Sequence, residues 1–328
     1  MEKVNHFKIR KSKFKIAMKA KVITFITIFI FAVQSIWAAE PSGKTTHLYA
    51  VKGTDSLRLD HYAAPVEGLR PCVMFVFGGG FSHGVRDKEA DIPYFEFLQR
   101  NGYDVVSIDY RLGMRDAKGV GVLDFFPLFR NTINLAVEDL FSATSFVVEH
   151  AEEWHIDPTK IIATGSSAGA ITVLQGEHTI CNCLPLTSLL PEGFNYAGII
   201  SFAGAVFTLG GAPEWSANTA PTLLFHGNSD TQVPYNKMAF FGCGMYGSKY
   251  IAKHLYEEGV PYWFYSVEYQ THAMAWEPMH NNHAEILLFL DEFVAKGGRQ
   301  QRDTHIRDLS LPERKTFFLP TDYLNSNY

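Results

Sequence analysis

Three short stretches of the chain are apolar almost throughout: CVMFVF at 72–77, VVSIDY at 105–110 and TLLF at 222–225. Strands that are buried on both faces of a parallel sheet have this composition. Segments with helical periodicity lie between them, since apolar residues recur at three- and four-residue spacing within 133–148 and again within 286–293. This alternation predicts an α/β fold, with a mostly parallel central sheet of about eight strands flanked by helices.

The predicted strands cover Thr46–Val51, Leu57–Tyr62, Cys72–Phe77, Val105–Tyr110, Ile161–Ala163, Ile199–Phe202, Thr222–Phe225 and Trp263–Val267. Only a few residues join the first two, so we expect an antiparallel hairpin at that edge of the sheet. We predict one domain over residues 39–296. Residues 297–328 are polar with scattered aromatic residues, and we expect them to form a tail packed on the domain.

The N-terminus has the pattern of a secretory signal peptide at 1–38. Residues 1–21 are rich in Lys and Arg, and the apolar run VITFITIFIFAV and the short stretch QSIWAAE follow them. The apolar run is short for a membrane span. We therefore expect an exported protein, periplasmic or secreted, with no stable membrane span after cleavage. An uncleaved N-terminal anchor is the alternative, and translation from Met18 would shorten the basic region.

Charge and cysteine content limit the partners and the covalent links. The net charge is −5 and no basic stripe is present, so the composition speaks against nucleic-acid binding. Cys72 lies in a predicted strand and is expected to be a small core residue. In an exported protein, a disulfide joining Cys181 or Cys183 to Cys243 is allowed, and the sequence does not choose between the pairings.

The stretch ATGSSAGA at 163–170 follows the apolar residues IIA at a predicted strand end. A plain turn would use the same residue types. The spacing Gly165-x-Ser167-x-Gly169 is also that of a nucleophile elbow, in which a sharp strand-to-helix turn exposes the central serine. Ser166 is off-centre between the glycines. We therefore predict Ser167 as the nucleophile.

A second glycine-rich stretch, MFVFGGGFSHG at 74–84, follows another predicted strand. Consecutive glycines let backbone N–H groups converge on a negative oxygen, and we predict an oxyanion hole from Gly79, Gly80 and Ala168. A flexible loop is the simple alternative. A phosphate-binding loop would require a lysine and a Ser/Thr that this stretch lacks.

Two further polar loops follow predicted strands. LLFHGNSDTQVPY at 223–235 contains Asp230, and VEYQTHAMAWEPMHNNH at 267–283 contains His272. We predict that Asp230 orients His272, with His280 and His283 as the alternative bases and His226 in a structural role. Parallel strands bring their C-terminal ends to one edge of a sheet, so these loops should meet beside the serine.

No metal or other cofactor is predicted. Two groups of residues could be considered for zinc, but neither has a spacing typical of a zinc site: Glu277, His280 and His283, and His178, Cys181 and Cys183.

Together these motifs resemble the α/β-hydrolase fold carboxylesterase/lipase superfamily, and more narrowly hormone-sensitive-lipase-like and bacterial feruloyl- and acetyl-esterases. The matching motifs are GGGF at 78–81, DYRL at 109–112, GSSAG at 165–169, HGNSDTQVPY at 226–235 and THA at 271–273. The resemblance implies an exported serine carboxylic-ester hydrolase that acts through a Ser-His-Asp triad and an acyl-enzyme. The family usually has His where this chain has Phe77.

Residues 111–131 and 175–196 exceed what the core fold needs and are expected to form small cap insertions. Phe81, Phe126 and Trp276 are predicted substrate-binding residues, which favours acetyl or feruloyl esters of carbohydrates. A serine peptidase, an acyltransferase and a catalytically silent ligand-binding protein remain the alternatives, because one fold serves many functions.

Overall fold

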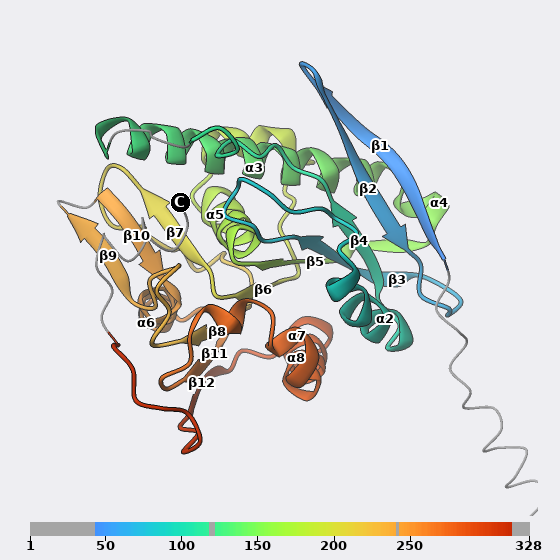
Figure 1. Ribbon diagram of the computed structural model, residues 1–328. Coiled ribbons are helices and arrows are strands. Elements are labelled where there is room, and N and C mark those ends of the chain that lie inside the picture. The colour runs from blue at the N-terminus through green and yellow to red at the C-terminus, as the bar shows by residue number, and fades with distance from the viewer. Residues whose placement is uncertain (1–42, 118–121, 241–242, 317–328) are drawn as a thin grey trace, which may run out of the picture. The chain divides into compact units, whose positions relative to one another are not determined.

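The computed structural model describes residues 43–117, 122–240 and 243–316, so the predicted signal peptide lies outside the described residues. Nine strands form the central sheet in the order β1-β2-β4-β3-β5-β6-β8-β11-β12 (Figure 1). Their bounds are β1 Lys44–Lys52, β2 Asp55–Tyr62, β3 Arg70–Val76, β4 Asp104–Ile108, β5 Ile156–Ser166, β6 Gly198–Phe202, β8 Thr222–Gly227, β11 Tyr262–Val267 and β12 Gln301–Ile306.

The sheet is parallel from β4 to β12, while β1 and β2 pair antiparallel and β2 also runs antiparallel to β4. The predicted hairpin and the mostly parallel sheet are therefore confirmed. The inner strands β3, β4 and β6 lie among the buried core residues, as their apolar sequences predict.

The ninth strand differs from the prediction, because β12 lies within the segment that we expected to be a surface tail. It pairs in parallel with β11, in a register that sets Tyr262 opposite Gln301. Its residues alternate between exposed and half-buried, as on a sheet edge with one solvated face. Polar contacts hold it: the indole Nε1 of Trp263 donates to Thr304 Oγ1 at 2.9 Å, and Arg302 lies over the Trp263 ring at 4.5 Å.

A second, three-stranded antiparallel sheet has the order β7-β10-β9 and was not predicted. Its strands are β7 Ala205–Thr208, β9 Lys237–Phe240 and β10 Cys243–Gly247. It is smaller than the central sheet, and β7 follows β6 after only two residues.

Helices cover both faces of the central sheet. Figure 1 shows α3 and α5 on one side and α2 and α8 on the other. The helical segments are η1 Glu89–Asp91, α2 Ile92–Arg100, α3 Val122–Glu149, α4 Ala151–Trp154, α5 Ala168–Cys181, η2 Pro185–Leu189, α6 Ser248–Glu257, η3 His272–Ala275, α7 Pro278–Asn281, α8 His283–Phe289 and η4 Leu290–Ala295. Across the described ranges, none of the helices combines the length and apolarity that a membrane crossing requires.

All four cysteines are free, so the disulfide considered between Cys181 or Cys183 and Cys243 is absent. Cys72 is buried in β3, as expected of a core residue.

Helix α5 is buried along almost its whole length, and it carries a buried acid, Glu177. Glu177 Oε1 accepts hydrogen bonds from the Ala220 backbone N–H at 2.7 Å and from Asn195 Nδ2 at 3.3 Å. Burial raises the pKa of Glu177 to about 7, although these two hydrogen bonds lower it. Through these bonds the acid links α5 to the segment that leads into β8.

We predict that Glu177 makes the free energy of unfolding depend on pH. Its pKa in the folded protein, about 7, lies above the ordinary value of 4.5 that applies in the unfolded chain. Between these values the unfolded chain ionises first, so stability falls as pH rises from about 4.5 to about 7 and then levels off. The loss should be on the order of 3 kcal/mol. Urea unfolding of wild type and Glu177→Gln at pH 5 and pH 8 measures this loss. If the two proteins differ in unfolding free energy by the same amount at both pH values, the prediction is contradicted.

Candidate functional site

The turn between β5 and α5 places Ser167 in a strained conformation, with φ 52° and ψ −113°. The two flanking glycines allow this turn to pack closely. A Cβ on Gly165 would lie 2.3 Å from the backbone of Gly169, and a Cβ on Gly169 would lie 1.9 Å from the carbonyl oxygen of Val76. Any side chain at either position would therefore separate β3, β5 and α5. The Gly-x-Ser-x-Gly spacing is thus a packing requirement of this elbow.

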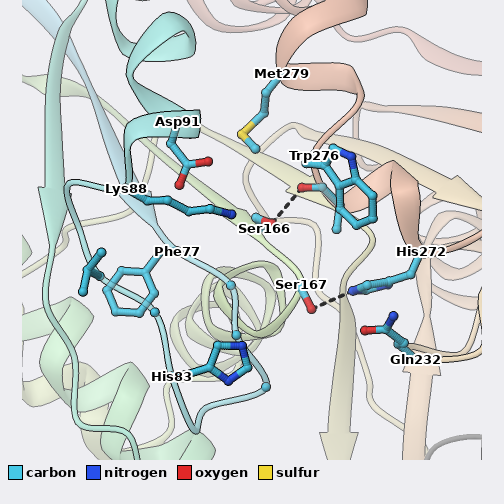
Figure 2. A pocket seen from close by; sticks show the side chains of 16 residues that line it. Phe77, His83, Lys88, Asp91, Ser166, Ser167, Gln232, His272, Trp276 and Met279 are labelled. Atoms are coloured by element: carbon cyan, nitrogen blue, oxygen red, sulfur yellow. Dashed lines mark hydrogen bonds between the residues drawn. The ribbon is translucent and has the colours of Figure 1, made fainter. Parts of the chain in front are cut away.

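Ser167, His272 and Asp230 lie in hydrogen-bond contact although they are far apart in the chain. Ser167 Oγ is 2.8 Å from His272 Nε2, a contact that Figure 2 shows, and His272 Nδ1 is 2.7 Å from Asp230 Oδ2. The supporting loops are packed backbone to backbone, since a Cβ on Gly227 would lie 2.2 Å from the carbonyl oxygen of Gln270. The structure therefore brings together the three side chains that the sequence selected.

The Asp230 carboxylate is surrounded by donors. Its Oδ1 accepts the backbone N–H groups of Gln232 and Val233 at 2.7 and 2.9 Å. Its Oδ2 also lies 3.2 Å from Nε2 of the buried His226. Burial alone would raise the pKa of Asp230, but the charge that His272 carries when it is protonated and the hydrogen bonds from both imidazoles hold it well below the ordinary value. The carboxylate is thus kept ionised beside His272.

His226 has the supporting position that we expected. Its Nδ1 lies 2.8 Å from Ser248 Oγ. A neutral imidazole protonated on Nε2 donates to Asp230 and accepts from the Ser248 hydroxyl, which satisfies both ring nitrogens.

The two alternative histidines lie elsewhere. His283 stacks on Phe97 with ring centroids 3.7 Å apart, and its Nε2 lies 2.7 Å from the carbonyl oxygen of Met279. His280 is exposed at the end of α7. Within 43–117, 122–240 and 243–316, no three His, Cys, Asp or Glu side chains gather as metal ligands.

The glycine loop lies directly against the elbow, because a Cβ on Gly78 would lie 3.0 Å from the Ser166 carbonyl oxygen. The Gly79 carbonyl accepts the N–H groups of Ser82 and His83 at 3.0 and 3.2 Å. Because a trans peptide points its C=O and N–H in opposite directions, the N–H of Gly80 faces away from that turn. Both Gly79 and Gly80 have positive φ, 121° and 59°, which favours glycine.

Phe77, at the position where the resemblance predicted from the sequence would place a histidine, is fixed by Tyr110. The Tyr110 hydroxyl donates to the Phe77 carbonyl at 2.9 Å, and the two rings lie 4.5 Å apart. An aromatic contact therefore supports the start of the glycine loop.

A cavity of about 390 Å³ opens beside Ser167 (Figure 2). The glycine loop, Ser166, Ser167, His272 and Trp276 line it, and Trp276 is 48% exposed. The sequence did not indicate several other lining side chains, among them His83, Lys88, Asp91, Gln232 and Met279. Only their closeness to the motifs along the chain could have indicated them.

Phe81 and Phe126, predicted to bind substrate, do not line this cavity. Phe81 is 1% exposed and packs edge-on against Phe129 at 5.8 Å, so it belongs to the core beneath the glycine loop. Phe126 stacks parallel to Phe207 of β7 at 6.4 Å. Apolar packing accounts for both rings, and Trp276 is the one predicted aromatic residue at the cavity.

The expected cap insertions do not cover the cavity either. No described residue of segment 111–131 or of segment 175–196 lines the cavity. Much of the first segment forms the N-terminal part of α3, and the second extends α5 and forms η2.

Comparisons with known proteins find similarity to esterases. The BD-FAE family model matches residues 59–180, which include the glycine loop and Ser167. The chain is 28% identical to fumonisin B1 esterase of Sphingopyxis macrogoltabida over 159 residues, 46% of this chain and 26% of that protein. It is 26% identical to juvenile hormone esterase of Heliothis virescens over 158 residues, 48% of this chain and 25% of that protein. The chain thus spans about a quarter of the length of these curated relatives.

Solved structures of an esterase from the Planctomycetes species Thermogutta terrifontis have the same fold. The native form of that esterase, Est2, has a TM-score of 0.55 at 21% identity and covers 78% of this chain and 95% of its own. The apo form has a TM-score of 0.56 at 22% identity, with 80% and 98% covered. The chain has the α/β-hydrolase fold, and its predicted resemblance to carboxylesterases of this fold is confirmed.

We predict that Gly169→Ala unfolds the elbow. Helix propensity alone would favour Ala by about 1 kcal/mol. The clash with the Val76 carbonyl outweighs this gain, and we expect a loss of at least about 3 kcal/mol of unfolding free energy. Urea unfolding measures it. Gly210→Ala is the control, because a Cβ there meets nothing within 4 Å. Equal stability of the two variants would contradict the packing argument.

Proposed function

We propose that this chain is a serine carboxylic-ester hydrolase that works through an acyl-enzyme. The observation that carries the proposal is the hydrogen-bonded series from Ser167 through His272 to Asp230 at a cavity wall. The resemblance to carboxylesterases supports the same reaction class.

In the first step, His272 takes the proton of Ser167 as the alkoxide attacks the ester carbonyl. The 2.8 Å contact to Nε2 suits this transfer. It requires the imidazole tautomer that carries its proton on Nδ1, and the Asp230 carboxylate selects that tautomer by accepting the proton's hydrogen bond. Because Asp230 stays ionised, it also stabilises the imidazolium that forms.

The negative oxygen of the tetrahedral intermediate then needs donors. The N–H groups of Gly79, Gly80 and Ala168 are our proposed oxyanion hole. Ala168 is the first residue of α5, so its N–H has no partner within the helix, and the helix dipole favours negative charge at that end. His272 next donates its proton to the leaving alcohol, and water attacks the acyl-Ser167 by the same route in reverse.

For the substrate we propose acetyl or feruloyl esters of carbohydrates. Trp276 offers a half-exposed indole face at the cavity, and sugar rings and aromatic acyl groups both pack on such faces. Solved structures of the similar Thermogutta terrifontis esterase include propionate-bound and butyrate-bound forms and a form phosphorylated by paraoxon. By analogy, short acyl groups and organophosphates are suitable first probes.

We predict that Ser167→Ala abolishes hydrolysis of p-nitrophenyl acetate. Removing a triad nucleophile typically costs about a million-fold in turnover. A fluorophosphonate probe should label wild type and should not label this variant. Mass spectrometry of the labelled peptide identifies the modified serine.

The adjacent serine provides the matched control. The Ser166 hydroxyl donates to the Ala275 carbonyl at 2.7 Å and is directed away from His272, so Ser166→Ala should still be labelled (Figure 2). Label on Ser166, or hydrolysis by a folded Ser167→Ala protein, would contradict the proposed nucleophile.

We also propose that residues 1–38 direct export, on the strength of their basic and apolar pattern. The expected result is a protein recovered from the periplasm or medium that begins after Ala38 or Ala39. Sequencing of the mature N-terminus locates the cleavage site. A recovered protein that still begins at Met1 or Met18 would contradict cleavage of a signal peptide.

A further inference from the structure

Asp91 is a buried acid in the cavity wall that the proposed mechanism does not use. It is 6% exposed and lines the same cavity as Ser167. Asp91 ends the η1 segment and precedes α2 directly, and its helical backbone angles, φ −92° and ψ −17°, do not suit the usual N-cap hydrogen bond to a backbone N–H. It makes no such bond, and Figure 2 shows its carboxylate directed toward the cavity.

The surroundings leave this carboxylate without a polar partner. Its side chain makes no hydrogen bond or ion pair with any other residue that the structure describes, and its oxygens are not among the fully buried atoms without a partner, so they are open to the cavity. Burial raises the pKa of Asp91, and the charges of Lys88 and His280 lower it. A carboxylate that is open to a cavity and has no hydrogen-bond partner in the protein is suited to a partner that enters with a ligand.

Lys88 supplies the complementary chemistry. Its ammonium lines the same cavity and extends into it on the side of Asp91 (Figure 2). Lys88 is an exposed residue, and its side chain forms no ion pair within the described ranges. The cavity thus presents one pure acceptor and one pure donor on the same wall.

We propose that Asp91 and Lys88 form a subsite that binds a hydroxyl group of the substrate. A hydroxyl donates to the carboxylate and accepts from the ammonium at once, so it satisfies both. A carboxylate on the substrate could pair with Lys88 but not with Asp91, and a cationic group could pair with Asp91 but not with Lys88, so neither satisfies both groups. This inference rests on the proposed ester hydrolysis and assigns hydroxylated esters as its substrate class.

The hydroxyl could belong to the acyl group, as in a phenolic cinnamate, or to the alcohol, as in a sugar. Two matched ester pairs separate these sources. Methyl ferulate is compared with methyl 3,4-dimethoxycinnamate, and a monoacetylated methyl glucoside with its tri-O-methyl counterpart. Within each pair only the free hydroxyls are replaced by methoxy groups.

The experiment measures kcat/KM for both pairs with wild type, Asp91→Asn, Asp91→Ala and Glu89→Gln. We expect wild type to prefer the hydroxylated member of one pair, and Asp91→Ala to reduce that preference about 10-fold to 100-fold, as for a hydrogen bond to a charged group. Asp91→Asn keeps the size and should give a smaller reduction. Glu89→Gln is the matched control, because Glu89 is an exposed acid in the same η1 segment and lies outside the cavity.

Binding gives a second readout that does not depend on turnover. In the Ser167→Ala background, the Kd of the preferred hydroxylated ester should rise by a similar factor when Asp91→Ala is added. The pair that responds identifies the source of the hydroxyl. Unchanged preference in both pairs, or equal losses for both members of a pair, overturns the subsite. If wild type hydrolyses no ester, the proposed function fails, and the Kd comparison still decides on the subsite.

Discussion

The functional end of this molecule depends on one close approach between backbones. At the end of β5, Gly165 lies against Gly169, and Gly169 lies against the Val76 carbonyl at the end of β3. Without a Cβ at either position, α5 can begin immediately beside two parallel strands. Ser167 then occupies the top of the turn with positive φ, a strained conformation that the surrounding packing maintains. Position and strain of the serine therefore have one cause.

The same approach couples the proposed nucleophile to the proposed oxyanion loop. Because β3 and β5 are neighbours in register, with Val76 opposite Gly165, the chain that leaves β3 must pass directly over the elbow. Gly78 makes that passage without a side chain, and the Gly79 carbonyl turns back to bind Ser82 and His83. Donors and nucleophile thus keep a fixed relation, because both are anchored to adjacent strands and not to flexible segments.

The sequence predicted those parts of the site whose position follows from strand ends. Ser167, Asp230 and His272 each follow a buried strand of a parallel sheet, and this rule alone brings them to one edge. It fails where position depends on tertiary packing. The polar strand β12 has no apolar signal and is held by contacts such as Trp263 to Thr304. An aromatic residue such as Phe81 could line a ligand cavity or pack in the core. The Phe81 side chain packs in the core, and no local sequence pattern distinguishes the two orientations.

Two buried aspartates illustrate how the fold separates structural from ligand chemistry. Asp230 receives two backbone N–H groups and faces two imidazoles, so the protein itself supplies everything that keeps its charge stable. Asp91 is buried to a similar degree, yet its side chain makes no hydrogen bond with the residues that the structure describes. A fold that can satisfy one carboxylate so fully leaves the other open toward the cavity. This difference assigns to Asp230 the role of orienting His272, and to Asp91 the role of binding a substrate group in the cavity.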